Sequence, residues 1–289
     1  MWQLAVDCSQ VEDGTAVVTA ADIADAARLL GLSGLPVCVH ASLRSFGWVD
    51  GGAPAVVNGL LAERCTVLVP TFSWTFAVPP PAKLRRPRNA WDYDSWEASS
   101  AGEGRIFTPD SNEIDVEDMG AIPASIVSMP ERVRGCHPLC SFSAVGPLAT
   151  RLVSGQTPLH VWAPLEALAR AGGSVVLMGV GVGKMTLLHL AEQTAGRNPF
   201  RRWANGTDGD PIEVEAGGCS DGFGDLLPVL RPLQRECKVG TSRWLIFPAS
   251  PTLEAASAAI RAAPMVTHCA NPGCGRCRDA VLGGPLLDS

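Results

Sequence analysis

The sequence predicts an α/β fold in which helices cover a largely buried sheet. Short apolar runs, such as TVLVP at 66–70, alternate with longer stretches in which apolar residues recur every three or four positions. Hydrophobic residues make up 46% of the chain and charged residues 18%, a balance typical of a folded globular protein. The length of 289 residues suits one large domain, and we expect a single domain over residues 1–289.

The expected elements follow one another in a regular order. Thr19 can cap the first helix, which presents Ile23 and Leu30 on one face. The run 37–40 that follows is apolar enough for a buried strand. We expect helices at 21–32, 51–64, 147–155, 164–173, 185–196, 223–230 and 251–264, and strands at 37–40, 66–70, 174–180, 212–216 and 243–250.

Two long stretches interrupt this order. Residues 71–123 are rich in Pro, Trp, Ser and acidic residues, and residues 197–210 are rich in polar and turn-forming residues. Connections as long as the first are uncommon in a compact domain and are usually functional or disordered. We expect a long loop at 71–123 and turns around a short strand at 197–210.

The charge and the ends of the chain exclude several classes of protein. A net charge of −6 argues against a nucleic-acid partner, which requires a basic surface, and suits an enzyme with a cationic substrate. No run of 18 apolar residues is present, so we expect no transmembrane helix and no membrane partner. The first residues lack the basic-then-apolar order of a signal peptide, which predicts a cytoplasmic protein.

Two glycine-containing strings resemble catalytic motifs. The run GVGVGK at 179–184 fits neither the phosphate-loop nor the dinucleotide-binding pattern, and we expect a tight strand-to-helix turn there. The string GCSDG at 218–222 matches the G-x-S-x-G nucleophile elbow, with a strand expected before it and a helix after it. Ser220 would then be the nucleophile of a serine hydrolase, although His268 is the one histidine that follows it in the sequence.

A third pattern lies on the helix expected at 185–196. Thr186, His189 and Glu192 are three residues apart and therefore share one face of that helix. A carboxylate beside an imidazole fixes the tautomer of the ring and stabilises the cation that forms when the ring takes up a proton. His189 and Glu192 are the candidate catalytic pair.

The C-terminal segment 268–277 predicts a metal site. Cys269, Cys274 and Cys277 are separated by four and by two residues among turn-forming Gly and Pro, a spacing that can place three thiolates around one zinc ion. The candidates for the fourth ligand are Cys219, Cys237 and His268, and we draw the site with Cys219. Four protein ligands would make the zinc structural, and the alternative is a set of reduced thiols.

Three strings in order carry a resemblance to a known family. They are VHASLRSFGWVDGGA at 39–53, MGAIP at 119–123 with RVRGCHPLCSFSAVG at 132–146, and SVVLMGVGVGKMTLLHLAE at 174–192. With these strings the chain resembles the aminoglycoside 3-N-acetyltransferases, antibiotic acetyltransferases that use acetyl-coenzyme A. The resemblance implies a three-layer α/β/α sandwich with the coenzyme in a cleft, and transfer of acetyl from the thioester to an amine.

The resemblance also implies roles for single residues. His189 matches the general base, which takes a proton from the amine of a small, cationic acceptor such as an aminoglycoside. Other residues match loops that contact the coenzyme or shape the site: His40, Ser42, Leu43, Thr71, Ser73, Met119 and Arg134.

Departures from the family pattern keep other functions open. Where resistance enzymes usually carry an acidic residue after an aromatic position, this chain has RWAN at 202–205. This difference and the cysteine-rich tail fit a branch of the family that is not dedicated to resistance. They also fit a protein that binds coenzyme A and zinc without turnover, which is the alternative to both the acetyltransferase and the hydrolase.

Overall fold

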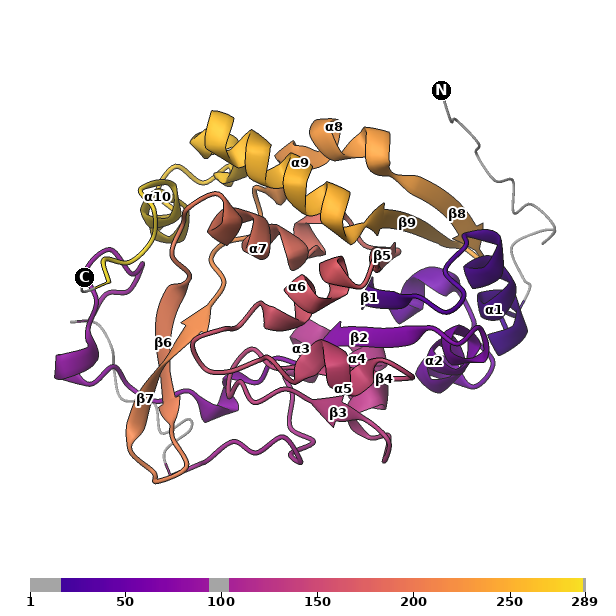
Figure 1. The fold of residues 1–289 in the computed structure, drawn as a ribbon, viewed down its shortest axis with the longest axis horizontal. Helices are drawn as coiled ribbons and strands as arrows, with labels where there is room; N and C mark the ends of the chain where they lie inside the picture. Colours follow the sequence, from indigo (N-terminus) through magenta and orange to yellow (C-terminus); the bar gives the residue numbers. More distant parts are fainter. Residues whose placement is uncertain (1–16, 94–103, 288–289) are drawn as a thin grey trace.

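The alternating strands and helices build a seven-stranded mixed sheet (Figure 1). The computed structural model describes residues 17–93 and 104–287, so the N-terminal stretch on which the signal-peptide expectation rests lies outside the described residues. The strands follow the spatial order β3-β4-β2-β1-β5-β9-β8. They are β1 (Pro36–Ala41), β2 (Thr66–Pro70), β3 (Val133–Arg134), β4 (Phe142–Val145), β5 (Ser174–Met178), β8 (Arg235–Val239) and β9 (Ser242–Pro248).

Three parallel strands form the centre of the sheet. β1 pairs with β2 on one side and with β5 on the other, and β4 and β9 flank them in antiparallel orientation. The sequence predicts all three central strands correctly, because nearly every residue in them is buried and apolar. Parallel strands end at the same edge of a sheet, so the segments that follow Ala41, Pro70 and Met178 start from one edge.

Helices cover both faces of the sheet, which confirms the α/β fold. Along β5, Val175 and Leu177 pack in the core beneath α5, α6, α7 and α9, whereas Val176 and Met178 pack with α1, α2 and α4. The helices are α1 (Ala20–Leu29), α2 (Gly52–Ala62), α3 (Val116–Met119), α4 (Ala121–Val127), α5 (Ala149–Val153), α6 (Ala163–Arg170), α7 (Leu187–Thr194), α8 (Leu227–Leu230), α9 (Ala249–Ala262) and α10 (Gly275–Val281). The chain also forms short 3-10 helices, among them η4 (Val182–Lys184), η5 (Phe223–Leu226) and η7 (Pro264–Thr267).

The first helix begins where the sequence predicts. The Thr19 side chain accepts a hydrogen bond from the backbone N–H of Asp22, and the Asp22 carboxylate accepts one from the Thr19 N–H. This reciprocal capping box satisfies two of the donors that a helix start leaves unpaired. On the inner face, a Cβ on Gly59 of α2 would lie 2.5 Å from the Ile23 Cβ, so α1 and α2 approach closely because position 59 is glycine.

The two irregular stretches hold more regular structure than the sequence predicts. Residues 200–216 form a separate hairpin of β6 (Phe200–Asn205) and β7 (Pro211–Ala216), which extends beside the main sheet in Figure 1. β6 is a full strand because the apolar side chains of Phe200 and Trp203 are buried. The expected loop at 71–123 contains α3 and runs into α4, where Ile122 faces the core.

Three strands were not predicted from the sequence, and one helix was predicted wrongly. β3 is too short to give a pattern, β4 has only four residues with Ser143 and Ala144 in the middle, and β8 is an edge strand with Cys237 and Val239 as its buried residues. The helix expected at 223–230 is instead η5 followed by α8. Pro228 lies in the first turn of α8, where its missing N–H is tolerated, and it cannot continue a helix from before that point.

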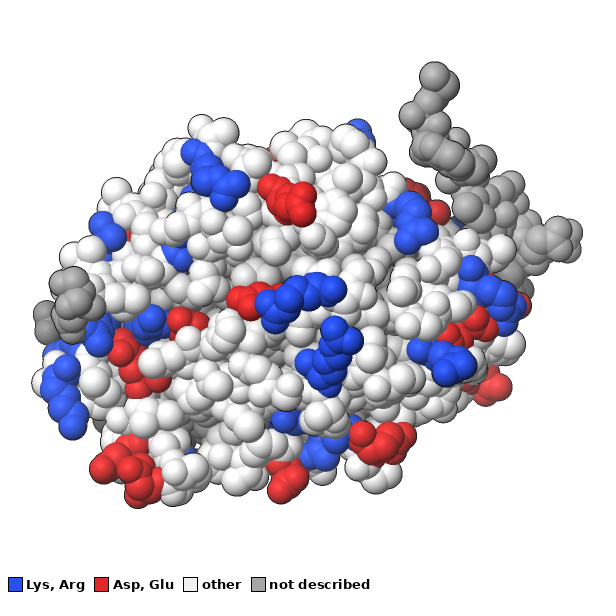
Figure 2. Space-filling view, viewed as in Figure 1, with Lys and Arg blue, Asp and Glu red and all other residues white. Residues whose placement is uncertain are grey.

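The surface carries charges of both signs. On the face that Figure 2 shows, lysine and arginine side chains are interspersed with acidic ones. Among the described residues, no helix has the length and apolar character needed to cross a bilayer. Mixed surface charge gives weak long-range fields, so the charge that a ligand meets depends mainly on the groups that line a cavity.

Candidate active site

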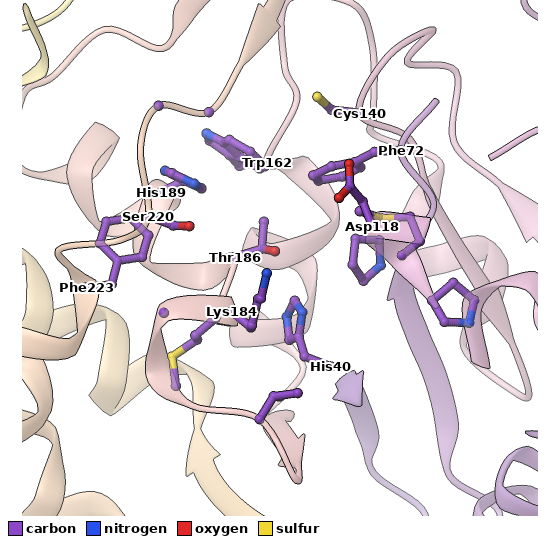
Figure 3. Close-up of a pocket in the computed structure, with 18 of the residues that line it drawn as sticks. His40, Phe72, Asp118, Cys140, Trp162, Lys184, Thr186, His189, Ser220 and Phe223 are labelled. Carbon is purple, nitrogen blue, oxygen red and sulfur yellow. The ribbon is translucent and has the colours of Figure 1, made fainter. Parts of the chain in front are cut away.

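A cavity of about 440 Å³ opens at the edge where the parallel strands end. Ala41 at the end of β1, Phe72 after β2 and Val180 after β5 line one part of it. Further parts of the wall come from α7, from the segment 217–223 after β7, and from α3, α4, η4, β6 and α10 (Figure 3). Its volume lies within the range of small-molecule sites, about 300–1,000 Å³. This cavity is the candidate active site.

His189 on α7 lines the cavity and belongs to a chain of buried hydrogen bonds. Its Nδ1 lies 2.9 Å from Glu192 Oε2, and Glu192 Oε1 accepts a hydrogen bond of 2.7 Å from Arg197. Arg197 also donates to Thr267 Oγ1 at 2.7 Å and to the Pro264 carbonyl oxygen at 2.5 Å. The contact with Glu192 fixes the ring and leaves Nε2 as the nitrogen available to a ligand.

Neighbouring groups hold the plane of this imidazole. Trp162 stacks on the ring with planes 13° apart and centroids 5.5 Å apart, and Phe223 meets it edge-on at 4.8 Å. The backbone of Gly217 passes so close that a Cβ there would lie 2.9 Å from His189 Nε2. Figure 3 shows His189 between Trp162 and Phe223, so the ring is confined on several sides.

His40 and Lys184 form a second part of the wall. Burial, with a smaller contribution from the Lys184 charge, lowers the pKa of His40 to about 4. His40 is therefore neutral at pH 7, and its Nε2 lies 3.7 Å from Cys38 Sγ. It can offer a ligand a neutral hydrogen-bonding group, but not a positive charge.

The cavity lining carries more positive than negative groups. Lys184, Arg202 and Arg276 contribute cations, and Asp118 is the carboxylate among the described lining residues. Arg202 is 5% exposed, lies 4.6 Å from the Trp91 ring centroid and donates to two backbone carbonyls. Burial lowers the pKa of Arg202 to about 10, so it stays charged at pH 7. Such a lining attracts phosphate and other anionic groups.

The residues expected to contact the coenzyme divide into two sets. His40 and Met119 line the cavity. Ser42 and Leu43 follow Ala41 in a 3-10 turn and are not among the lining residues. Thr71, Ser73 and Arg134 are buried and are likewise not in the lining.

Arg134 links the loop after β2 to the β3–β4 pair. Its guanidinium donates to the Thr71 and Glu113 carbonyl oxygens at 2.8 and 2.9 Å and to Ser141 Oγ at 2.9 Å. The Thr71 hydroxyl contacts Ser141 and Ser143 within the same network. These contacts position the backbone that leads into Phe72, so this set supports the cavity from behind.

Ser220 lines the cavity beside His189 (Figure 3). In the part of the chain that the structure describes, no hydrogen bond joins its Oγ to a histidine. His268, the base expected for it, has Nδ1 2.8 Å from the Cys269 carbonyl oxygen. The strand before Ser220 belongs to the small hairpin rather than to the main sheet. The arrangement therefore does not support the serine hydrolase.

Four cysteines, one of them in the segment 217–223, lie close together. The Sγ atoms of Cys219, Cys269, Cys274 and Cys277 all lie within 4.8 Å of one another. The other two candidates for the fourth ligand, Cys237 on β8 and His268, are not in this group. The nine cysteines of the described residues form no disulfide.

Sequence reasoning missed several groups that build the cavity. Trp162 and Phe223 enclose the imidazole, and Arg197 holds the carboxylate of Glu192. These residues belong to no recognised sequence motif, and only the folded structure shows that they lie beside His189 and Glu192. Gly217 was detectable in principle, since it adjoins a string that already resembles an active-site loop.

The buried histidines predict a stability that falls in acid. His137 Nδ1 accepts hydrogen bonds from the N–H groups of Leu139 and Cys140, and burial lowers the pKa of His137 to about 3. In the unfolded chain a histidine has a pKa of about 6.5, so below that pH the unfolded chain binds more protons. We expect His40 and His137 each to lower the free energy of unfolding by up to about 1.4 kcal/mol per pH unit as the pH falls from 6.5 to 4.

Chemical denaturation across this pH range checks the expectation. In His137→Asn, Oδ1 can replace Nδ1 as the acceptor for Leu139 and Cys140, while the titratable ring is lost. The pH slope of this variant should be shallower than that of the unaltered protein. Equal slopes would contradict the assignment.

The chain has recognisable relatives. Residues 38–261 match the family model described as aminoglycoside 3-N-acetyltransferase. Aminoglycoside N(3)-acetyltransferase IX of Micromonospora chalcea is 34% identical over 181 residues, and the match covers 60% of each chain. The SPbeta prophage-derived aminoglycoside N(3')-acetyltransferase-like protein YokD of Bacillus subtilis is 33% identical over 220 residues, covering 71% of this chain and 74% of its own. The chain thus matches about 60% of the first relative's length.

Solved structures share the fold. The crystal structure of aminoglycoside acetyltransferase AAC(3)-IVa is similar with a TM-score of 0.73 at 23% identity, covering 94% of this chain and 100% of that one. A structure described as AAC-IIIb in a binary complex with CoASH has a TM-score of 0.65 at 20% identity, covering 86% and 97%. At these identities the similarity shows a common layered α/β architecture.

Proposed function

Because the chain belongs to the aminoglycoside 3-N-acetyltransferase family, we propose that it is an acyltransferase acting on an amine of an aminoglycoside or a related cationic compound. The acetyl donor is acetyl-coenzyme A. The observation that carries the proposal is His189 in the cavity wall, held by Glu192 at 2.9 Å. The family match spans β1 to α9 and so includes the elements that supply most of the cavity.

The proposed reaction requires a base. The amine nitrogen attacks the carbonyl carbon of the thioester and forms the amide bond, and the C–S bond breaks. His189 Nε2 takes the proton that the nitrogen loses, and the departing sulfur takes up a proton as coenzyme A leaves as a thiol. Glu192 stabilises the imidazolium between these steps. Positioned base catalysis contributes about 10²- to 10⁴-fold in rate, with the rest coming from holding amine and thioester together.

The charges of the cavity suit both substrates. Lys184 lies near neutral His40 at the strand edge and provides positive charge for the phosphates of the coenzyme. Asp118 is available to a cationic acceptor. AAC-IIIb, which shares the fold, is described in complex with CoASH.

The proposal has two further components. A zinc ion at Cys219, Cys269, Cys274 and Cys277 has a structural role, because four protein ligands leave no position for substrate. The protein acts in the cytoplasm, and its free thiols suit a reducing compartment.

The test is an assay of free-thiol release from acetyl-coenzyme A with a panel of aminoglycosides and amino sugars. We expect thiol release with at least one acceptor, and mass spectrometry should show one added acetyl group on it. Hydrolysis of an aryl acetate without coenzyme A would instead support the hydrolase. Binding of coenzyme A without turnover of any amine would support the non-catalytic protein.

A further inference from the structure

We propose that a zinc ion at the four-cysteine centre (Cys219, Cys269, Cys274 and Cys277) fixes the wall of the cavity that positions His189. The centre joins two segments that are far apart in the sequence, 217–223 and 264–277. Each segment leads to His189 by its own set of contacts. The expected effect of zinc on kcat rests on the proposed function, whereas the expected binding of zinc does not.

The four thiols fit a tetrahedral zinc ion. Zinc–sulfur bonds of about 2.3 Å place sulfur atoms about 3.8 Å apart in a tetrahedron, and the four Sγ atoms already lie within 4.8 Å of one another. Cys274 and Cys277 form a C-x-x-C pair at the start of α10. The backbone N–H of Cys269 lies 3.3 Å from Cys277 Sγ, which is the kind of hydrogen bond that stabilises a metal-bound thiolate.

The first route from the metal centre runs through the segment 217–223. Cys219 follows Gly217, which lies against the imidazole, and precedes Phe223, which meets the ring edge-on at 4.8 Å. The segment also packs closely against η7. A Cβ on Gly222 would lie 2.2 Å from the Thr267 carbonyl oxygen, so glycine is needed at this approach. A displacement of Cys219 would therefore move two of the groups that confine the ring.

The second route runs through η7 to the carboxylate behind the ring. Cys269 follows Thr267 by two residues, and Thr267 Oγ1 accepts a hydrogen bond of 2.7 Å from Arg197. Arg197 in turn donates to Glu192, which lies 2.9 Å from His189 Nδ1. The metal centre thus anchors both the aromatic contact and the hydrogen-bonded chain of the imidazole.

Metal loss should affect the ring more than the sheet. The four cysteines lie outside the seven-stranded sheet, in the segments 217–223 and 264–277. Without a cation, the four sulfur atoms lose the bonds that join them, and the two segments keep only their hydrogen bonds and packing. We expect a lower kcat, because His189 loses its confinement. We also expect a higher KM for the coenzyme, because Arg276 lines the cavity and lies between Cys274 and Cys277.

Metal analysis of the full chain is the first test. Elemental analysis should find one zinc per chain after purification, and replacement by cobalt(II) should give the absorption of tetrahedral cobalt thiolate. The proposal would be overturned if the purified chain held iron instead of zinc, or if it held far less than one metal ion per chain.

Variants then test the coupling between the metal and the ring. Cys274→Ser should lose most of the zinc and lower kcat at least tenfold, and Cys274→His, which keeps a zinc ligand, should recover both. The control is Cys136→Ser, because Cys136 is an exposed free thiol outside the centre. Should Cys274→Ser lose its zinc and keep its kcat, the coupling is wrong.

A readout without turnover separates this inference from the proposed function. The imidazole NMR signals of His189 should shift or broaden in Cys274→Ser and stay unchanged in Cys136→Ser. If no amine is acetylated, these signals and the zinc content still decide the proposal. Unaltered signals in a zinc-free but folded Cys274→Ser protein would refute it.

Discussion

His189→Ala is expected to lower kcat for acetyl transfer by about 10²- to 10⁴-fold, the contribution of a positioned general base. The loss should fall on kcat, because the side chain acts on the proton of the attacking amine and the coenzyme is held mainly by other groups. Thiol release gives kcat, and calorimetric titration with coenzyme A gives the affinity. The affinity should change little.

Two comparisons make this result specific. His160→Ala is the matched control, since His160 is a partly exposed histidine outside the cavity. Ser220→Ala separates the enzyme classes: a hydrolase loses all activity, whereas an acetyltransferase loses less than it does with His189→Ala. Near-normal turnover in a folded His189→Ala variant would remove this residue from the role of base.

The central strands of the sheet were predictable from the sequence, whereas several outer strands were not. The three parallel strands are buried on both faces. Strands of this kind need apolar side chains on both faces, and the resulting continuous apolar runs are recognisable in the sequence. β8 and β4 were missed because an edge strand and a four-residue strand with small central residues have weak hydrophobic patterns. β7 was expected at 212–216, but β6 was expected only as a short strand among turns, because its residues Arg201 and Arg202 look like loop residues in the sequence.

The site was predictable as far as its residues are neighbours in the sequence. His189 and Glu192 lie one helical turn apart, and the structure places them 2.9 Å from each other. Arg197 and Thr267, which extend this contact, lie on different elements, and no spacing rule connects them. The four cysteines are an intermediate case, because three are close in the sequence and the fourth was one of several candidates.

Glu192→Gln is expected to lower both kcat and stability. The amide cannot compensate the imidazolium that forms when His189 takes a proton, so kcat should fall. We expect a loss of about 10- to 100-fold, as when a carboxylate that orients a metal-bound histidine is removed. Arg197 would keep its charge with a side chain only 7% exposed and no carboxylate beside it. Removing one partner of a buried ion pair costs about 3–5 kcal/mol. Steady-state kinetics and chemical denaturation measure the two effects.

The double variant Glu192→Gln with Arg197→Met separates the two effects. It removes the buried cation together with its partner, and neutral side chains of similar volume often restore the stability that a broken buried pair has lost. We expect the free energy of unfolding to recover substantially while kcat stays low, because no carboxylate faces His189 Nδ1. If kcat recovered together with stability, Glu192 would act only through the fold. If kcat stayed low while the free energy of unfolding recovered, the Glu192 carboxylate would act directly on the imidazole of His189. There it holds the tautomer and stabilises the positive charge.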